Sequence, residues 1–427
     1  MLDRNIPPPI YSPTEFDFKL QSLSTHLLDN GIPLYYISDD IEPVIQLELV
    51  FEAGLWYESQ KGIAQATAAL IKSGTSTKTA FEINQCVEQY GASLKAAAGS
   101  DRASIQISCL TKHLAHILPL VAEIIQDTQF PQSELDIYIQ NAKQRLSVQL
   151  RKGDFIANRK IDEYLFGFQH PYGRYMLSDD YDSITVQQLK QHLHHYYTSK
   201  TCQLFLAGSF DQSAIELINH YLGNITWNSQ LLQEEKHHNT EATPEKKFRI
   251  INDEKSVQGA IRLASHFPEK HHPDFPYMIM LNTVFGGYFG SRLMSNIRED
   301  KGYTYGIHSY MYNHRYLGAY LISTEAGRDV CEATLEEVYN EMKRLREEPI
   351  PNEELQLVKN YLLGNILGDL DGSFQIIQRW KNLLLNGFGE ERFYSNIETY
   401  KQVESEKLME MANTYLHPEL FYELIVY

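Results

Sequence analysis

Histidine side chains occur close together in three short stretches of the chain, and two of these stretches also contain a glutamate. These are "HLHH" at His192–His195, "EKHH" ending at His237 and His238, and "HFPEKHH" at His266–His272. Zinc chemistry requires neutral imidazoles to hold the ion and a carboxylate to take a proton from bound water. The first stretch has no carboxylate spaced to join its histidines on one helix, and Pro268 breaks a helix in the last. We therefore expect surface histidines in all three stretches.

The stretch "GIAQATAALIKSGT", Gly62 to Thr75, has the length and frame of a catalytic helix. Positions 65 and 69 are four residues apart, so they share one helix face, and position 68 lies beside them. A zinc site of the H-x-x-E-H type would place two histidines and a glutamate there. This chain has Gln65, Ala68 and Ala69 instead. Because a Gln amide is a poor zinc ligand and a methyl group is none, the helix predicts neither metal binding nor general base catalysis.

The residues around this helix resemble the insulinase/pitrilysin family of inverzincin metallopeptidases. The frame of "FEAGLWYESQKGIAQATAALIKSGT" matches that family at Phe51, Gly54, Glu58, Gly62, Ala64, Gly74 and Thr75. The stretches "YGASLKAAAGSDRASIQI" and "FGFQHPYGR" extend the resemblance, and it continues through the second half. It therefore covers nearly the whole chain.

The resemblance implies that every zinc ligand has been lost. The family's two histidines would fall on Gln65 and Ala69, and its catalytic glutamate on Ala68. The third ligand, a glutamate, would fall near Arg145 and Leu146, in a stretch without any Asp or Glu. We expect no metal in this chain.

A glycine-rich turn, Gly286-Gly287-Tyr288-Phe289-Gly290, lies in the second half. It leads into a helix expected from near Ser291 to Lys301, with Gly302 as its C-cap, and then into the alternating strand "YTYGIHSY". In two-chain members of the family, such a loop of the non-zinc subunit helps to receive substrate. The resemblance therefore implies a substrate-binding role for Gly286, Gly287 and Gly290, although Gly-Gly turns are common in any protein.

The resemblance also implies that Arg298 and Tyr305 contact the bound peptide opposite the zinc. An arginine can hold a peptide carbonyl with fixed donors, and a tyrosine hydroxyl can stabilise a developing oxyanion. Tyr303 is the alternative if the register differs by two residues. On the residues alone, Arg298 could equally be a solvated helix residue and Tyr305 an ordinary strand aromatic.

Composition describes an ordinary globular chain of 427 residues, with 43% hydrophobic and 22% charged residues. The net charge of −17 argues against nucleic acid as a partner. The four cysteines are widely spaced, which argues against disulfide scaffolds and thiolate zinc sites. No apolar run approaches the length of a membrane span, and the N-terminus lacks the apolar region of a secretory signal. These features predict a cytoplasmic location and no membrane contact.

The sequence indicates that the chain consists of a duplicated domain. "FPQSELDIYIQNAKQRLSVQL" and "IPNEELQLVKNYLLGNIL" share P-x-x-E-L and a helical period, and similar helices and strands precede both in the same order. We expect an α+β fold of two homologous domains, each a mainly antiparallel sheet with helices on one face, resembling the LuxS-like metallopeptidase fold. The expected boundaries are 1–226 and 250–427, joined by a polar linker at 227–249.

Three functional hypotheses remain. In the first, the chain is the inactive subunit of a heterodimeric zinc peptidase, completing a chamber and lending Arg298 and Tyr305 to a zinc-bearing paralogous partner that acts on peptides. In the second, it is a structural or peptide-binding scaffold, as are related core proteins of a respiratory complex. In the third, it is an autonomous metallopeptidase with other ligands. We expect the chain alone to be inactive, with homodimers possible in isolation.

Overall fold

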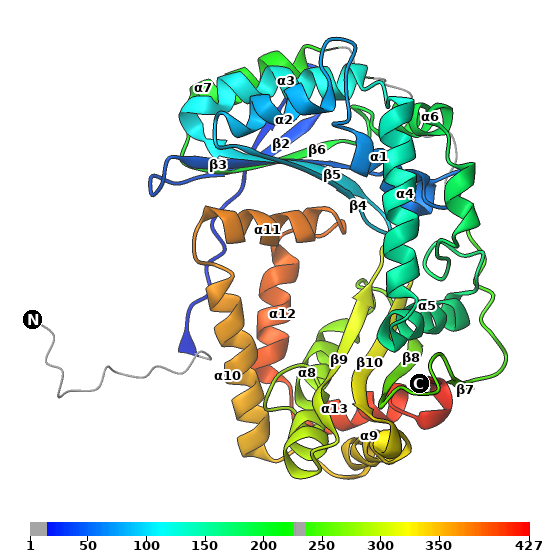
Figure 1. Ribbon diagram of the computed structural model, residues 1–427. Coiled ribbons are helices and arrows are strands. Elements are labelled where there is room, and N and C mark those ends of the chain that lie inside the picture. Colours follow the sequence, from blue (N-terminus) through cyan, green and yellow to red (C-terminus); the bar gives the residue numbers. More distant parts are fainter. Residues whose placement is uncertain (1–14, 226, 228–235) are drawn as a thin grey trace, which may run out of the picture.

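The computed structural model describes residues 15–225, 227 and 236–427. In this part of the chain the strands form two sheets, one in each half of the sequence, and helices cover both sheets (Figure 1). The α+β class with two related sheets, predicted from the sequence, is confirmed. The domain boundaries stay a prediction. Residues 226 and 228–235, around the start of the expected linker, lie outside the described residues, and strand β7 begins at Lys247.

The first sheet has the strand order β1-β2-β6-β3-β5-β4. Strands β2 and β6 run parallel, and the other neighbours run antiparallel. Strand β5 alternates between buried and half-buried residues, as expected for a sheet with one face on a core. The strands are β1 Ser24–Leu27, β2 Pro33–Ser38, β3 Val44–Phe51, β4 Ser93–Ala98, β5 Ala103–Leu110 and β6 Gln203–Gly208.

The second sheet repeats this arrangement in the order β7-β11-β8-β10-β9. Its one parallel pair, β7 with β11, corresponds to the parallel pair β2 with β6 of the first sheet. In the first sheet, β6 lies between β2 and β3, and in the second sheet β11 lies between β7 and β8, so in each case the last strand of the half lies between two earlier strands. This equivalence supports the duplication read from the sequence. The strands are β7 Lys247–Ile250, β8 Gln258–Phe267, β9 Thr304–Asn313, β10 Gly318–Gly327 and β11 Tyr422–Val426.

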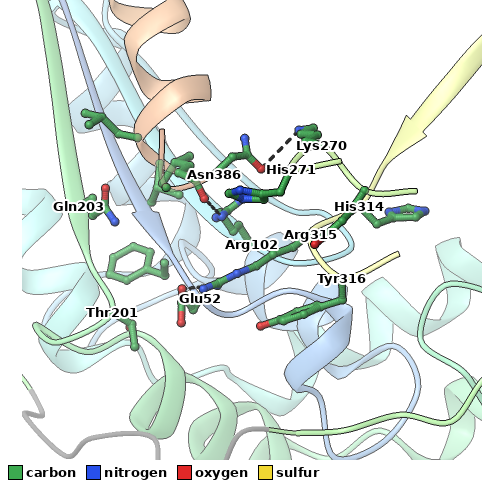
Figure 2. Close-up of a pocket in the computed structure, with 16 residues that line it drawn as sticks. Glu52, Arg102, Thr201, Gln203, Lys270, His271, His314, Arg315, Tyr316 and Asn386 are labelled. Carbon is green, nitrogen blue, oxygen red and sulfur yellow. Dashed lines mark hydrogen bonds and ion pairs between the residues drawn. The ribbon is translucent and has the colours of Figure 1, made fainter. Parts of the chain in front are cut away.

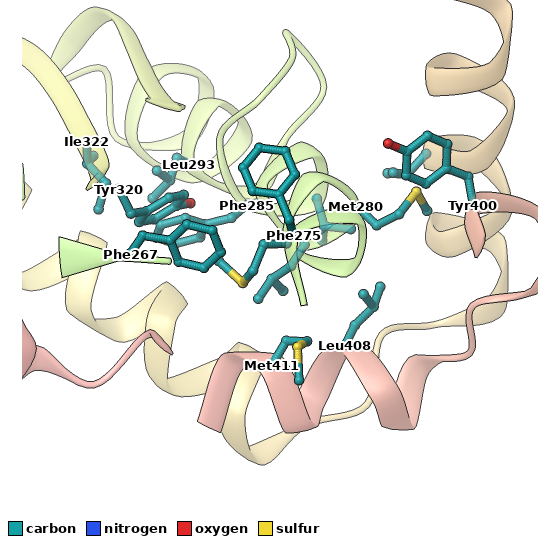
Figure 3. Close-up of a cluster of buried hydrophobic side chains, with 14 of the residues drawn as sticks. Phe267, Phe275, Met280, Phe285, Leu293, Tyr320, Ile322, Tyr400, Leu408 and Met411 are labelled. Atoms are coloured by element: carbon teal, nitrogen blue, oxygen red, sulfur yellow. The ribbon is translucent and has the colours of Figure 1, made fainter. Parts of the chain in front are cut away.

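Helices of the same half cover one face of each sheet (Figure 1). Helix α3 buries Leu114, Ile117, Val121 and Ile124 at helical spacing. Helix α8 is buried on nearly all sides in the second core (Figure 3). The helices are α1 Ile63–Leu70, α2 Ala80–Glu88, α3 Leu114–Asp127, α4 Gln132–Gln149, α5 Gly153–Phe166, α6 Val186–Tyr196, α7 Gln212–Ile218, α8 Phe275–Phe285, α9 Cys331–Glu347, α10 Asn352–Gly368, α11 Ser373–Leu384, α12 Glu390–Gln402 and α13 Ser405–Tyr415.

The two halves exchange one helix each across their other sheet faces. Helix α5 of the first half packs on β8 and β11 of the second, and helix α11 of the second half packs on β6 and β2 of the first (Figure 1). Gly153 permits the close approach of α5, because a Cβ there would lie 3.2 Å from the carbonyl oxygen of Val426. Each core is thus completed by a helix from the other half, which ties the halves together.

The turn between β9 and β10 also crosses between the halves. The ring of Tyr316 stacks on Trp56 with centroids 4.1 Å apart, and its hydroxyl lies 3.1 Å from that of Tyr57. The backbone N–H of Arg315 donates to Asp101 over 3.0 Å. Aromatic stacking and partly buried hydrogen bonds therefore fix the turn against the first half. Among the described residues, no helix has the length and apolarity to cross a membrane.

Candidate functional site

The degenerate zinc helix α1 begins at a tight turn after the short 3₁₀ helix η2, Leu55–Tyr57. Gly62 adopts a left-handed conformation there, with φ of 85°. Any side chain at this position would also collide with Met176, whose Cε would lie 2.6 Å from the added Cβ. The left-handed backbone conformation therefore favours glycine here, whereas the Met176 side chain could move aside.

A buried carboxylate holds the start of α1. Glu58 accepts a 3.0 Å hydrogen bond from the backbone N–H of Ala64 through Oε2, and a 2.9 Å hydrogen bond from Arg174 through Oε1. Burial raises the pKa of Glu58, and the Arg174 guanidinium opposes this effect. The carboxylate thus serves to position the helix.

The structure brings the first and third degenerate ligand positions together. Gln65 and Leu146 line one cavity of about 270 Å³, with α4 packed against α1. Ala69 is exposed and Ala68 is buried. An amide, two methyl groups and a leucine side chain supply no donor set for zinc. No cluster of three His, Cys, Asp or Glu side chains suited to a metal occurs within the described residues.

Cationic and aromatic side chains line much of this cavity. The Arg159 guanidinium lies 4.0 Å from the ring centroid of Tyr175 and 5.1 Å from that of Phe155, and it donates to the carbonyl of Met176. Burial lowers the pKa of Arg159. Arg174 lies on the same wall. The cavity beside Gln65 is therefore lined by Arg159 and by the Arg174–Glu58 ion pair.

Arg298 and Tyr305 lie together in the second half, which is the lower half of Figure 1. The Arg298 guanidinium lies 5.8 Å from the ring centroid of Tyr305 and 4.6 Å from that of Phe289. Tyr305 is 94% exposed and Phe289 is 63% exposed. Arg298 belongs to a π-helical segment, η6 Met294–Asp300, and such segments are frequent at functional sites. We call Arg298, Tyr305 and Phe289 the exposed cluster.

Tyr303 differs from Tyr305 in its surroundings. Its side chain is half-buried and packs on the second core, and its backbone N–H donates to Ile297 over 3.0 Å. The helical segment ends at Asp300 with Lys301 as its C-cap, so the expected C-cap at Gly302 is wrong by one residue; Gly302 follows with φ of 67°. Tyr305 is therefore the tyrosine that this segment presents to solvent.

The three glycines of the turn have packing roles of their own. A Cβ at Gly286 would lie 2.5 Å from Ser309 Oγ, and one at Gly287 would lie 2.9 Å from the Cα of Thr283. Gly290 lines a cavity of about 700 Å³ between η6, α9 and α10. The turn must lie close to α8 and β9, and this requirement alone accounts for Gly286 and Gly287.

The expectation of surface histidines is wrong for His192. Its ring is buried behind α1, with Nε2 3.1 Å from the carbonyl oxygen of Ala53, and burial lowers its pKa to about 4. His238 packs edge-on against Trp56 with centroids 4.6 Å apart. Both are neutral packing residues at pH 7. The helical spacing of Leu189 and His192 on α6 could have revealed the burial of His192.

Sequence reasoning missed Arg159, Arg174 and Phe289. Arg174 stands at the end of the quoted stretch "FGFQHPYGR", and Phe289 lies between the glycines of the turn. Arg159 follows Phe155 by four residues, a spacing that places both on one face of α5. Only the fold shows that this face meets the cavity beside Gln65.

Comparison with known proteins is consistent with this geometry. A family model described as insulinase (peptidase family M16) matches residues 35–168, and one described as peptidase M16 inactive domain matches residues 183–362. The "uncharacterized zinc protease YmxG" of Bacillus subtilis is 24% identical over 331 residues, covering 76% of this chain and 79% of that protein. The "non-peptidase homolog YmxG" of Helicobacter pylori is 22% identical over 347 residues, covering 78% and 77%.

Two further similarities concern a subunit and a solved structure. Mitochondrial-processing peptidase subunit alpha-1 of Dictyostelium discoideum is 23% identical over 195 residues, covering 43% of this chain and 29% of that protein. The crystal structure of a peptidase M16 inactive domain from Pseudomonas fluorescens superposes with a TM-score of 0.83 at 21% identity, covering 95% of this chain and 98% of the other. The fold is therefore shared along nearly the whole length.

Proposed function

The chain belongs to the insulinase (M16) family of peptidases, and on that premise we propose that it is the non-catalytic subunit of a two-chain zinc peptidase. The observation that carries the proposal is a contrast between its two halves. The zinc helix offers Gln65, Ala68 and Ala69 where ligands and base are needed, whereas the second half presents Tyr305 to solvent with the half-buried Arg298 beside it.

The exposed cluster fits a role at the active site of a partner. Phe289 and Tyr305 expose most of their ring surface, which costs free energy unless another molecule covers it. The guanidinium between them keeps its position by cation–π contacts, and its one ion pair among the described residues, to Glu299, is long at 3.8 Å. It is therefore free to hold a peptide carbonyl, and the Tyr305 hydroxyl is free to donate to an oxyanion.

The proposed partner is a paralogous chain that carries the zinc ligands. One relative is named as the alpha subunit of a processing peptidase, and another is named as a non-peptidase homolog. The second name supports an inactive chain, and the first supports one that works beside other subunits. In this arrangement zinc resides in the partner, and peptide is the substrate.

A reconstituted pair tests the proposal. The chain is purified alone and together with a zinc-bearing relative from the same source, and cleavage of a quenched peptide library and zinc content are measured. We expect the chain alone to be metal-free and inert and the mixture to cleave. The variant Arg298→Ala/Tyr305→Phe should assemble normally but lower kcat about 100-fold or more, the loss typical of removing an oxyanion donor.

The control Lys343→Ala removes another exposed cation of the second half and should leave kcat unchanged. If the double variant keeps full activity, Arg298 and Tyr305 are not contributed to the partner. If the pair does not assemble, or gains nothing over the relative alone, the scaffold function is favoured. Stoichiometric zinc in the chain alone would instead indicate an autonomous metallopeptidase.

A further inference from the structure

A cavity of about 450 Å³ lies where the two halves of the chain meet, apart from both sites described above (Figure 2). The first half contributes the end of β3, Arg102, and the start of β6. The second half contributes the loop after β8, the turn between β9 and β10, and the end of α11. The volume is in the range of small-molecule sites, which is about 300–1,000 Å³.

Three cationic side chains, Arg102, Lys270 and Arg315, and two carboxylates, Glu52 and Glu269, line this cavity. Arg315 is neutralised by an ion pair with Glu52 that crosses between the halves (Figure 2). Arg102 donates to the backbone carbonyl of Leu385, which carries no formal charge. Lys270 has only a long contact of 3.4 Å to the amide oxygen of Asn386. Within the described ranges, no ion pair joins Arg102 or Lys270 to a carboxylate.

The environment of these two cations is unfavourable to charge. Burial lowers the pKa of Arg102, with a further lowering from Arg315 that the carboxylates of Asp101 and Glu52 oppose. Burial also lowers the pKa of Lys270, with a further lowering from Arg102 that Asp101 opposes. The two side chains therefore repel each other across a partly dehydrated space. A buried charge is stabilised when an opposite charge with hydrogen-bond acceptors lies beside it.

Other groups on the wall suit an anion. His271 and His314 both line the cavity, and burial lowers the pKa of His314, so that it is a neutral donor at pH 7. Glu269 is the remaining carboxylate of the lining, and it lies exposed at the rim. Figure 2 shows Arg102, Lys270 and His271 gathered on one side of the cavity.

We propose that this cavity is a binding site for a small multivalent oxyanion, held jointly by Arg102 of the first half and Lys270 of the second. Phosphoryl and carboxylate compounds share the required chemistry, which is several oxygens and at least two negative charges. Because Arg102 and Lys270 come from different halves of the chain, the bound anion connects the two halves at their junction. This site is independent of the exposed cluster and of any partner subunit.

Thermal unfolding and calorimetry of the full chain at pH 7 test the proposal, with pyrophosphate and citrate as probes and sodium chloride at matched ionic strength as control. We expect one bound anion per chain and a concentration-dependent rise in Tm, as for any ligand that binds only the folded state. A response to pyrophosphate alone identifies a phosphoryl site, and a response to citrate alone identifies a carboxylate site. If neither pyrophosphate nor citrate binds, and neither raises the Tm above its value in sodium chloride of matched ionic strength, the proposal is overturned.

Two variants make the test specific. Lys270→Gln and Arg102→Gln should each weaken anion binding at least tenfold, while the exposed-site control Lys255→Gln binds as the wild type does. Without anion, Lys270→Gln should unfold at a temperature equal to or above that of the wild type, because repulsion with Arg102 is removed. A lower Tm without anion, or undiminished binding by both variants, contradicts the assignment.

Discussion

Arg174 donates a 2.9 Å hydrogen bond to Glu58 directly beneath the start of the degenerate zinc helix. The two side chains are nearly withdrawn from solvent, at 12% and 1% exposed. Glu58 also accepts a hydrogen bond from the backbone N–H of Ala64. The pair therefore fixes the start of α1, whose positions 65, 68 and 69 carry Gln, Ala and Ala.

Removing Arg174 should destabilise the protein strongly. Arg174→Met leaves Glu58 buried without its cation, and breaking a buried pair on one side costs about 3–5 kcal/mol. The double variant Glu58→Gln/Arg174→Met should recover most of this loss, because no charge is left unpaired. Urea unfolding of the wild type and both variants measures the difference.

The loss of stability in Arg174→Met should depend on pH. Burial raises the pKa of Glu58, so the carboxylate becomes more unfavourable to the fold as the pH rises above its unfolded pKa of about 4.3. Without the opposing Arg174, this loss grows, and Arg174→Met should be more destabilised at pH 8 than at pH 4. An equal loss at both values would show that packing rather than charge governs the effect.

Rebuilding the metal site is a direct test of the register of α1. Gln65 and Leu146 already line one cavity, and Ala69 follows Gln65 by one helical turn. The variant Gln65→His/Ala69→His/Leu146→Glu should bind one Zn²⁺ per chain, measured by metal analysis after dialysis. Gln65→His/Ala69→His should bind more weakly, since it lacks the third ligand. A folded triple variant without zinc would show that the register is wrong.

The sequence predicted the sheets and the duplication well because both depend on local pattern. Alternation in β5 and helical spacing in α3 each follow from residues close in the chain. The exchange of α5 and α11 could not be predicted. Ala157, Ile161 and Leu165 mark an apolar face at four-residue spacing, but such a face does not specify which sheet it will cover.

The candidate sites also differ in how much of each could be predicted from the sequence. The prediction that Gln65 and Ala69 stand at lost ligand positions depends on the family resemblance together with the register of α1. The exposed cluster needs the fold, since Phe289 reaches Arg298 only when the turn folds back on η6. Arg102 and Lys270 stand in different halves, and their shared cavity arises from long-range packing that no local pattern encodes.

The stacking of Tyr316 on Trp56 should contribute measurably to the junction of the halves. Tyr316→Ala removes an aromatic contact at 4.1 Å and the 3.1 Å hydroxyl contact to Tyr57. We expect a loss of about 2–3 kcal/mol in the free energy of unfolding, below the 3–5 kcal/mol of a fully buried aromatic. Tyr316→Phe, which keeps the stack, should lose about 1 kcal/mol. Equal losses for both variants would assign the effect to the hydroxyl.

Asp162 on α5 faces the second sheet and has no hydrogen-bond partner for Oδ1 within the described part of the chain. Burial raises its pKa to about 8, opposed by Arg262. The folded state therefore holds a proton that the unfolded state releases near pH 4. Between these values the folded chain binds more protons, so stability falls as the pH rises.

The variant Asp162→Asn should remove this dependence. It mimics the protonated side chain, so it should match the wild type near pH 4 and exceed it in stability at pH 8 by a few kcal/mol, since each unit of pKa shift corresponds to about 1.4 kcal/mol. Urea midpoints between pH 4.5 and 8.5 measure the difference. Because Arg262 is held by Asn158 and backbone carbonyls, it should not need the Asp162 charge. If Asp162→Asn is instead less stable at pH 8, the carboxylate is ionised in the fold and pairs with Arg262.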